Sequence, residues 1–378
     1  MSVEPVPAVL DLLAELVRGR SVGTGEGPLA RRAGALLDGA GFNVTTVGWE
    51  PGREQLIARA GSPSAPLTLT GHLDTVPVDA SQWAVDPWGA ERDGDRMIGR
   101  GASDMKSGVA ALLVAAAQHA GRPHECRGIQ IVLTAGEETG CTGAAMLQRS
   151  DLAVGGPLVV AEPTANRLVP GHKGAHWMRL IAKGRAAHGS APELGDNAVV
   201  RLARAAVALH DHAAWPTHER FGSVTANVGL FMGGVQANVV PDAAHMLLDL
   251  RTVPGATGNA LRGTVTKLAG EGVTVEDHVV LPVVDTPLDH PFVALVRQAL
   301  TVAGQDSVPQ PPARFFTDAS VLAALLAGDD GAPAPTVVLG PGEPDQCHVV
   351  DEWCSATKVK AAVEIYAALI NGWCTTGG

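Results

Sequence analysis

The sequence is poor in aromatic residues and cysteines, and it lacks both an excess of basic charge and a long apolar run. Its 378 residues include one tyrosine, six phenylalanines and seven tryptophans. Lysine and arginine number 28 against 39 aspartates and glutamates, so the formal net charge is −11. This balance excludes a large basic face for nucleic acid, although a small anionic substrate responds only to local charge.

Signals for membrane insertion and secretion are also missing. The longest apolar runs, such as GVAALLVAAAQHAG at 108–121, are too short to span a bilayer. Residues 1–20 show helical apolar spacing rather than a basic segment followed by an apolar one, so we expect no signal peptide. The five cysteines are odd in number and have no paired spacing, which predicts a reduced, cytoplasmic chain. They are Cys126, Cys141, Cys347, Cys354 and Cys374.

The first part of the chain alternates helical and β-rich patterns. The helical patterns fall at about 5–18, 28–40, 106–120 and 141–149, and the β-rich runs at 42–49, 65–71, 128–135 and 157–163. The last three runs are apolar throughout and end in polar residues, as strands of a buried, mainly parallel sheet do. The hydrophobic content of 46% indicates a globular chain. Its length of 378 residues fits two domains better than a single core.

A second pattern interrupts the first. From about residue 174 the order becomes strand, helix, strand, strand, helix, strand, which is typical of a ferredoxin-like unit. Beyond it, a helix at 291–304, a strand at 334–342 and a helix at 356–372 return to the first pattern. The predicted fold is therefore α/β. Residues 1–173 and 286–378 form a mainly parallel central sheet flanked by helices, and residues 174–285 form an inserted α+β domain.

Polar clusters stand where predicted strands of the larger domain end, in GHLDTVP, GRGASDMKSG, TAGEETG and VAEPT, and later in GPGEPDQCHVVDEW. Sites in open α/β sheets collect outside the carboxyl ends of the strands. Histidine and carboxylate ligands without cysteine suit zinc, cobalt or manganese in a hydrolytic site. Two histidines and three carboxylates serve two ions if one carboxylate bridges them. The candidates are His72, Asp74, Asp104, Glu137, Glu138, Glu162 and His348.

Each cluster alone has an ordinary structural explanation. A single histidine at a strand end is more often a hydrogen-bonded core residue than a ligand. The adjacent Glu137 and Glu138 suit the start of a helix, and Glu–Pro after a strand is a common turn. GRGASDMKSG lacks the third glycine of a dinucleotide fingerprint, which argues against nicotinamide binding. Taken together, the structural explanations would require five separate coincidences at strand ends, so the set of clusters favours a metal site.

In this order, GHLDTVP, GRGASDMKSG and GEETG resemble a known family over essentially the whole chain. It is the dinuclear zinc metallopeptidase family that includes acetylornithine deacetylase, succinyl-diaminopimelate desuccinylase, aminoacylase and glutamate carboxypeptidase. The resemblance implies two divalent ions, most readily zinc, with cobalt or manganese as alternatives. The implied ligands are His72 and Glu162 for one ion, Glu138 and His348 for the other, and Asp104 between them.

Catalytic roles follow from the same resemblance. Asp74 would orient His72 through a hydrogen bond to its far ring nitrogen, and a cis peptide bond is expected next to Asp104. Glu137 would be the general base, taking a proton from a metal-bridging water and delivering it to the leaving amine. A chain without this base would be a silent metal-binding scaffold, so the presence of Glu137 favours an enzyme.

The inserted domain contributes further candidates. His188 resembles a histidine that reaches the partner's active site in dimeric members, so a homodimer through the inserted lid domain is expected; the alternative is an ordinary turn histidine. Asn238 and Arg251 fall in segments that resemble substrate-contacting ones. Arg251 would bind a carboxylate in bidentate fashion, or else pair with Asp249 or Asp242.

Two other features lie beside the expected site. Asp318 falls in a segment, RFFTDAS, that resembles a substrate-contacting one, without an assigned role. Trp83 and Trp88 follow GHLDTVP closely and are interpreted as packing over the metal-site loop, with a narrowing of the acyl pocket as the alternative.

The branch of the family is suggested by AEPT followed by GHKG, which resembles acetylornithine deacetylases. The expected reaction is hydrolysis of the amide bond of an N-acyl amino acid. The alternatives are a carboxypeptidase or dipeptidase acting on a short peptide, and a succinyl-diaminopimelate desuccinylase. These reactions differ in the side of the amide that carries the recognised carboxylate.

Overall fold

A computed structural model describes residues 6–119 and 127–375, so Cys126 lies outside the described residues. The chain divides into two compact units. The larger unit is formed by Met1–Gly171, Val284–Pro311 and Thr317–Gly378, and the smaller unit by His172–Val283 and Pro312–Phe316. No pattern in the sequence indicated that the short segment Pro312–Phe316 belongs with the smaller unit.

The larger unit is built on a six-stranded mixed sheet with its parallel strands together. In spatial order the strands are β1 (Asn43–Glu50), β2 (Arg53–Ala60), β6 (Arg127–Thr134), β3 (Ser62–His72), β7 (Leu158–Val160) and β16 (Thr336–Val338). The last four pair in parallel, whereas β2 is antiparallel to both of its neighbours. The prediction of a mainly parallel central sheet is confirmed. Strand β2 was missed because its sequence, REQLIARA, has charged residues at both ends.

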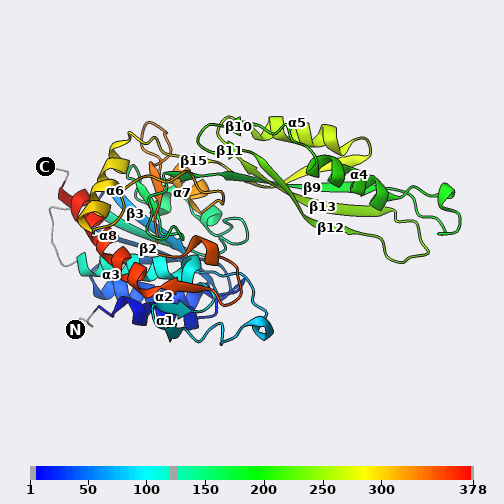
Figure 1. Ribbon diagram of the computed structural model, residues 1–378. Coiled ribbons are helices and arrows are strands. Elements are labelled where there is room, and N and C mark those ends of the chain that lie inside the picture. The colour runs from blue at the N-terminus through cyan, green and yellow to red at the C-terminus, as the bar shows by residue number, and fades with distance from the viewer. Residues whose placement is uncertain (1–5, 120–126, 376–378) are drawn as a thin grey trace. The chain divides into compact units, whose positions relative to one another are not determined.

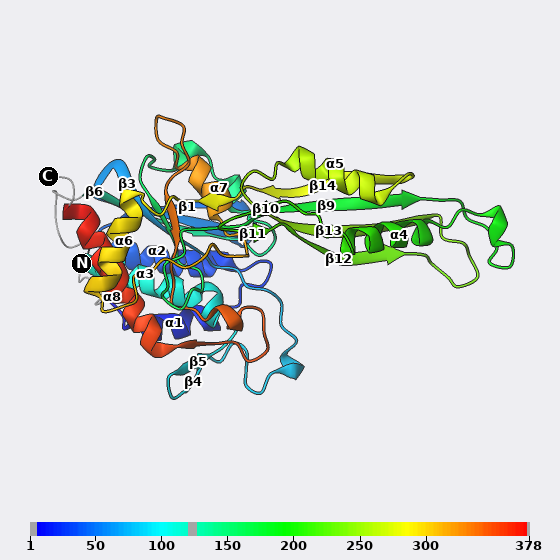
Figure 2. The same ribbon diagram turned by 45° about the horizontal axis from the view of Figure 1, so that its top comes forward.

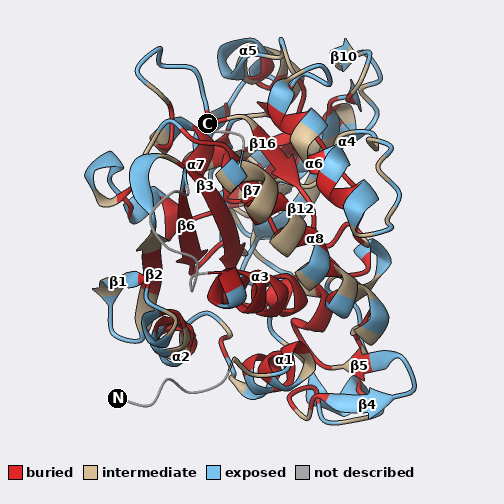
Figure 3. Cartoon of the chain, turned by 90° about the vertical axis from the view of Figure 1, so that its left-hand side faces the viewer, coloured by how far each residue is buried: buried red, intermediate tan, exposed pale blue. Residues whose placement is uncertain are grey.

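Helices cover this sheet and form the core with it. They are α1 (Val9–Arg18), α2 (Glu26–Gly39), α3 (Ser107–His119), α6 (Pro291–Val302), α7 (Ala319–Leu325) and α8 (Ala356–Thr375). Helix α2 packs on β1 and β2, α3 on β3, and α8 on β6. Between its polar ends helix α3 is apolar on all sides, as a buried helix is, and Figure 3 shows it buried along with β3 and β6.

The helix predicted at 141–149 is wrong. The chain there makes two short 3-10 turns, Ala144–Met146 and Arg149–Asp151. Cys141 has φ of 59°, outside the right-handed helical region, and the hydroxyl of Thr142 donates a hydrogen bond to the carbonyl of Gly136 at 3.0 Å. These local bonds close a turn where a helix would otherwise begin.

The smaller unit has the strand and helix order expected of a ferredoxin-like fold. Its elements are β9 (Gly174–Lys183), α4 (Ala198–His210), β12 (Thr225–Gly233), β13 (Ala243–Thr252), α5 (Gly258–Ala269) and β14 (Val273–Leu281). The strands form an antiparallel sheet in the order β12, β13, β9, β14, and α4 and α5 pack on it (Figures 1 and 2). The remaining short strands are β4 (Glu91–Asp93), β5 (Arg96–Ile98), β8 (Gly171–His172), β10 (Thr217–His218), β11 (Gly222–Ser223), β15 (Val284–Asp285) and β17 (Trp353–Ser355).

The expectation of a fully reduced chain is also wrong. Cys374, in helix α8, is disulfide-bonded, whereas Cys141, Cys347 and Cys354 are free. Spacing along the sequence reveals pairs only when they follow a known local pattern, and Cys374 belongs to none. Among the described residues, no helix combines the length and apolar character needed to cross a membrane.

A buried histidine of the smaller unit makes its stability depend on pH. Burial lowers the pKa of His172 from 6.5 to about 4, because the charged ring would lose its hydration. Between these values the unfolded chain binds the extra proton, so stability falls by roughly 3 kcal/mol as the pH drops through this window.

We expect the substitution His172→Gln to remove this part of the acid sensitivity. The measurement is the free energy of unfolding in urea at about pH 7 and about pH 4.5, compared with wild type. The control is His278→Gln, at an exposed histidine of the same unit, which should keep the wild-type dependence. An unchanged difference between the two pH values in His172→Gln would contradict this assignment.

Candidate active site

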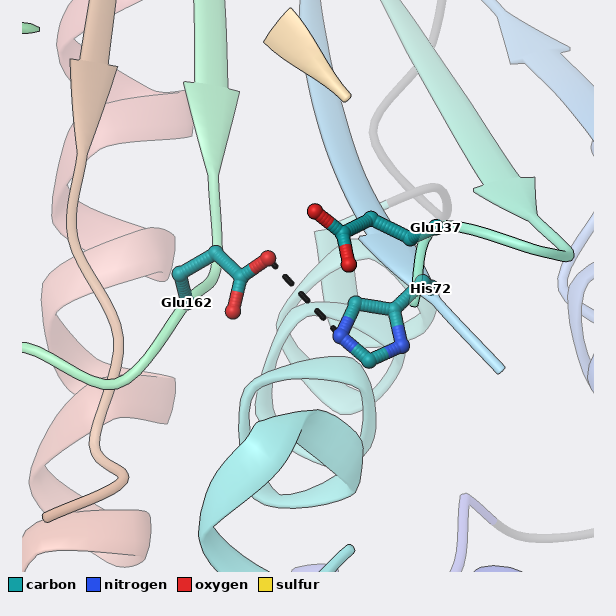
Figure 4. Close-up of side chains that lie close together, drawn as sticks. All are labelled: His72, Glu137 and Glu162. Atoms are coloured by element: carbon teal, nitrogen blue, oxygen red, sulfur yellow. Dashed lines mark ion pairs between the residues drawn. The ribbon is translucent and has the colours of Figure 1, made fainter. Parts of the chain in front are cut away.

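Three neighbouring strands deliver their polar end residues to one place. His72 is the last residue of β3, Glu137 follows β6, and Glu162 follows β7. Because β6, β3 and β7 are parallel neighbours, their carboxyl ends lie at the same edge of the sheet. Figure 4 shows the carboxylates of Glu137 and Glu162 turned toward the ring of His72, with 3.7 Å between Glu162 Oε1 and His72 Nε2.

Asp104 joins this group to a second histidine. Its Oδ1 lies 3.2 Å from Nε2 of His72, and its Oδ2 lies 3.2 Å from Nε2 of His348. Glu138 completes the second side, with its Oε2 3.1 Å from the same nitrogen of His348. One carboxylate thus faces two histidines with its two oxygens, which is the disposition of a bridging ligand.

The backbone around Asp104 is irregular. Asp104 has φ of −113° and ψ of 92°, and the expected cis peptide bond is found between Asp104 and Met105. Just beyond, helix α3 approaches the end of β7 closely. A Cβ on Gly108 would lie 2.0 Å from the carbonyl oxygen of Ala161, so only glycine permits this approach next to Glu162.

Asp74 has further partners besides the one expected. Nδ1 of His72 lies 3.0 Å from the backbone carbonyl of Asp74, while the Asp74 carboxylate is 3.6 Å from that nitrogen. The carboxylate also accepts hydrogen bonds from the backbone N–H groups of Glu137, at 3.2 Å, and Glu138, at 3.1 Å. A short loop after β6 exposes these two N–H groups, and Asp74 satisfies them both.

The electrostatics of the cluster favour bound positive charge. Burial raises the pKa of Glu137 and that of Glu162 well above the usual range. Burial lowers the pKa of His72, but the charge of Glu162 and the hydrogen bond to Asp104 outweigh it, so the net shift is upward. Hydrogen bonds to Asp104 and Glu138 raise the pKa of His348 to about 10. Protons therefore accumulate where a cation would compensate the carboxylates.

The donor set fits divalent metal ions. Ligand atoms of His72, Asp104 and Glu138 lie within 4.8 Å of one another, and so do those of His72, Glu137 and Glu162. Imidazole nitrogen and carboxylate oxygen are ligands that zinc, cobalt and manganese accept. The second group includes Glu137, which the resemblance marks as the base. By geometry, therefore, either Glu137 or Glu162 could be a metal ligand beside His72.

Two tryptophans cover the charged residues that flank Asp104. Trp83 and Trp88 are 9% and 8% exposed. The guanidinium carbon of Arg100 lies 5.2 Å from the centre of the Trp83 ring, and Nζ of Lys106 lies 5.8 Å from that of Trp88. These contacts agree with the interpretation that both tryptophans pack over the metal-site loop.

Asp318 is a further buried carboxyl close to this cluster. It is 3% exposed and accepts a hydrogen bond from the hydroxyl of Thr134, at the end of β6. Burial raises the pKa of Asp318 to about 6. The side chain thus adds to the negative charge that surrounds His72.

The smaller unit brings two of its candidates together and keeps a third apart. His188 forms a β-bridge with Val239, and the N–H of Gly189 donates a hydrogen bond to the carbonyl of Asn238 at 2.8 Å. Both candidates lie beyond the Ala243 end of β13, whereas Arg251 lies near the other end. At about 3.3 Å per residue, at least about 25 Å of strand separates them.

Arg251 is paired with an acid, as the alternative anticipated. Its Nη2 lies 3.0 Å from Oδ2 of Asp249, and its guanidinium carbon lies 4.9 Å from the ring centre of Phe316. Trp177 donates a second hydrogen bond to Asp249, at 2.9 Å. A substrate carboxylate at Arg251 would have to compete with this neighbour.

Glu352 is the residue of the site that sequence reasoning missed. It lies within the cluster GPGEPDQCHVVDEW, where only His348 was selected. Its side chain is fully buried and contacts the Asp104 segment. A glutamate between an aspartate and a tryptophan carries no local sign of such burial, so only the long-range contacts reveal it.

Comparison with known proteins gives a match over most of the chain. Residues 68–372 match the model of peptidase family M20/M25/M40. An acetylornithine deacetylase from Vibrio campbellii is 27% identical, with 98% of this chain and 99% of that protein covered. An acetylornithine deacetylase from Vibrio atlanticus is 29% identical, with 88% of each chain covered.

Solved structures share the fold. An M20 family metallo-carboxypeptidase from Sulfolobus solfataricus superposes with a TM-score of 0.80 at 19% identity, covering 97% of this chain and 99% of that one. A dinuclear metal-binding peptidase of the M20 family from Bacillus subtilis gives a TM-score of 0.70 at 14% identity, with 96% of each chain covered.

Proposed function

Because the chain belongs to peptidase family M20/M25/M40, we propose that it is a dinuclear metal-dependent hydrolase that removes the acyl group of an N-acyl amino acid. The observation that carries the metal chemistry is Asp104, whose two oxygens face His72 and His348. Full-length similarity to proteins named acetylornithine deacetylase supports deacylation over peptide cleavage. Zinc is the proposed metal, with cobalt or manganese compatible with the same ligands.

In the proposed mechanism, His72 and Glu162 would hold one ion and Glu138 and His348 the other, and Asp104, which faces both histidines, would serve the two sites. Two divalent ions supply Lewis acidity, which polarises an amide carbonyl and makes water more acidic. Glu137 takes a proton from the attacking water and returns it to the leaving nitrogen. Burial raises the pKa of Glu137, which favours the protonated form that delivers a proton to the leaving nitrogen.

Substrate choice tests the proposal directly. We expect the zinc-loaded protein to release free amine from N-acetyl-ornithine or another N-acyl amino acid faster than from plain dipeptides. The panel should also contain N-succinyl-diaminopimelate, and kcat/KM is the quantity to compare. A preference for dipeptides would assign the chain to the peptidase alternative, and a preference for the succinylated substrate to the desuccinylase one.

A second part of the proposal is that two copies complete each site. His188 and Asn238 are separated from Arg251 by at least about 25 Å along β13. One small substrate therefore cannot touch both ends of the same smaller unit. Contacts from both ends require two copies of the chain, which supports a homodimer in which His188 acts on the partner's substrate.

Hybrid dimers distinguish this arrangement from a site within one chain. We expect Glu137→Gln and His188→Ala to be inactive separately and to recover activity when mixed. Each hybrid then has one site that combines an intact Glu137 with an intact His188 from the other copy. Subunit exchange is verified with two differently tagged chains. Proven exchange without recovery would contradict action in trans.

A further inference from the structure

Glu352 is a buried carboxylate whose two oxygens are both saturated by groups of one short segment. Oε1 accepts hydrogen bonds from the backbone N–H groups of Ser103, at 2.8 Å, and Asp104, at 2.9 Å. Oε2 accepts from the N–H of Gly101 at 2.9 Å and from Nη1 of Arg100 at 2.7 Å. The side chain has no exposed surface, so these four donors replace its hydration.

The segment around Asp104 has backbone N–H groups that it cannot satisfy with its own carbonyl groups. Ser103 and Asp104 lie in the first turn of the short helical segment Ala102–Lys106, so their N–H groups have no intrahelical partner, and the backbone leaves the helical region at Asp104. Glu352 accepts both of these bonds. The backbone from which Asp104 projects is thereby fixed, and its side-chain oxygens remain free to face the two histidines.

The same contacts connect Asp104 with the segment that carries His348. Glu352 follows His348 by a few residues, and the hydroxyl of Ser103 donates to the carbonyl of Trp353 at 2.7 Å. The N–H of Glu343, which precedes His348, donates to that hydroxyl at 2.9 Å. Hydrogen bonds therefore join the two segments on which Asp104 and His348 stand.

We propose that Glu352 is a positioning residue for the second metal ion. By holding the backbone of Asp104 against the segment of His348, it sets the geometry and affinity of the site formed by Asp104, Glu138 and His348. This inference rests on the proposed dinuclear function, and it assigns Glu352 no contact with metal or substrate.

The test is Glu352→Gln in the full chain, with Glu343→Gln as a matched control. Glu343 lies in the same part of the chain and is 8% exposed, but its carboxylate pairs with Lys358 at 2.7 Å rather than with the Asp104 segment. Metal-free protein is titrated with Co²⁺, and the number of bound ions, their affinities and the visible absorption spectrum are recorded. Thermal unfolding of the metal-free proteins is measured in parallel.

We expect Glu352→Gln to bind the second ion about 10–100-fold more weakly and to show an altered Co²⁺ spectrum. Glu343→Gln should bind both ions as wild type does. Two ions bound by Glu352→Gln with wild-type affinity and spectrum would overturn the inference, even if its unfolding temperature fell. A wild-type chain that binds fewer than two ions would overturn the dinuclear proposal and this inference together.

A second variant serves if Glu352→Gln does not fold. Glu352→Asp keeps the negative charge opposite Arg100 but withdraws the carboxylate by one methylene from the N–H groups of Ser103 and Asp104. This variant should also bind the second ion more weakly than wild type. Wild-type affinity in this variant would equally overturn the inference.

Discussion

Glu137→Gln is expected to reduce kcat by about 10²–10⁴-fold while both metal ions stay bound. Glutamine has nearly the shape of glutamate but cannot accept and return a proton, so the proton transfers lose their carrier. Bound metal is counted by elemental analysis, and turnover is measured on the best N-acyl amino acid of the panel.

The metal count decides between two readings of the geometry around His72. Glu137 and Glu162 both offer an oxygen close to that histidine, so Glu137 is a candidate ligand as well as a candidate base. Loss of one ion in Glu137→Gln would identify it as a ligand. Wild-type activity with two ions bound would remove it from both roles. Glu91→Gln, on the exposed strand β4, controls for loss of a surface carboxylate.

The strand ends were predictable because local pattern and topology act together there. Apolar runs that end in His72, Glu137 and Glu162 mark buried parallel strands, and the rule for open α/β sheets then places those ends together. This inference does not require knowing which distant residue each side chain contacts. In the smaller unit, the order of strand and helix patterns along the chain was enough to identify the elements.

What failed was pairing between distant parts of the chain. Glu352 contacts Ser103 across 249 residues, and nothing in its neighbourhood indicates the partner. The carboxylate of Asp74 lies 3.6 Å from the ring of His72, as the assignment requires, but its hydrogen bonds to two N–H groups of the loop after β6 were not foreseen. Sequence patterns report burial and period, whereas such contacts depend on the finished fold.

The largest loss of metal is expected from Asp104→Ala. One oxygen of Asp104 lies 3.2 Å from His72 and the other lies 3.2 Å from His348, so its removal would take a proposed ligand from each ion at once. Metal ions contribute several kcal/mol to the stabilisation of the transition state, so kcat/KM should fall by at least about 10³-fold.

The predicted signature of Asp104→Ala is weaker binding of both ions, unlike the single weakened site expected of Glu352→Gln. Co²⁺ titration of the two variants side by side measures this difference. Asp93→Ala, at an exposed aspartate of β4, is the control and should bind both ions normally. If Asp104→Ala held one ion with wild-type affinity, Asp104 would belong to a single metal, and Glu137 would be the remaining candidate ligand beside His72 and Glu162.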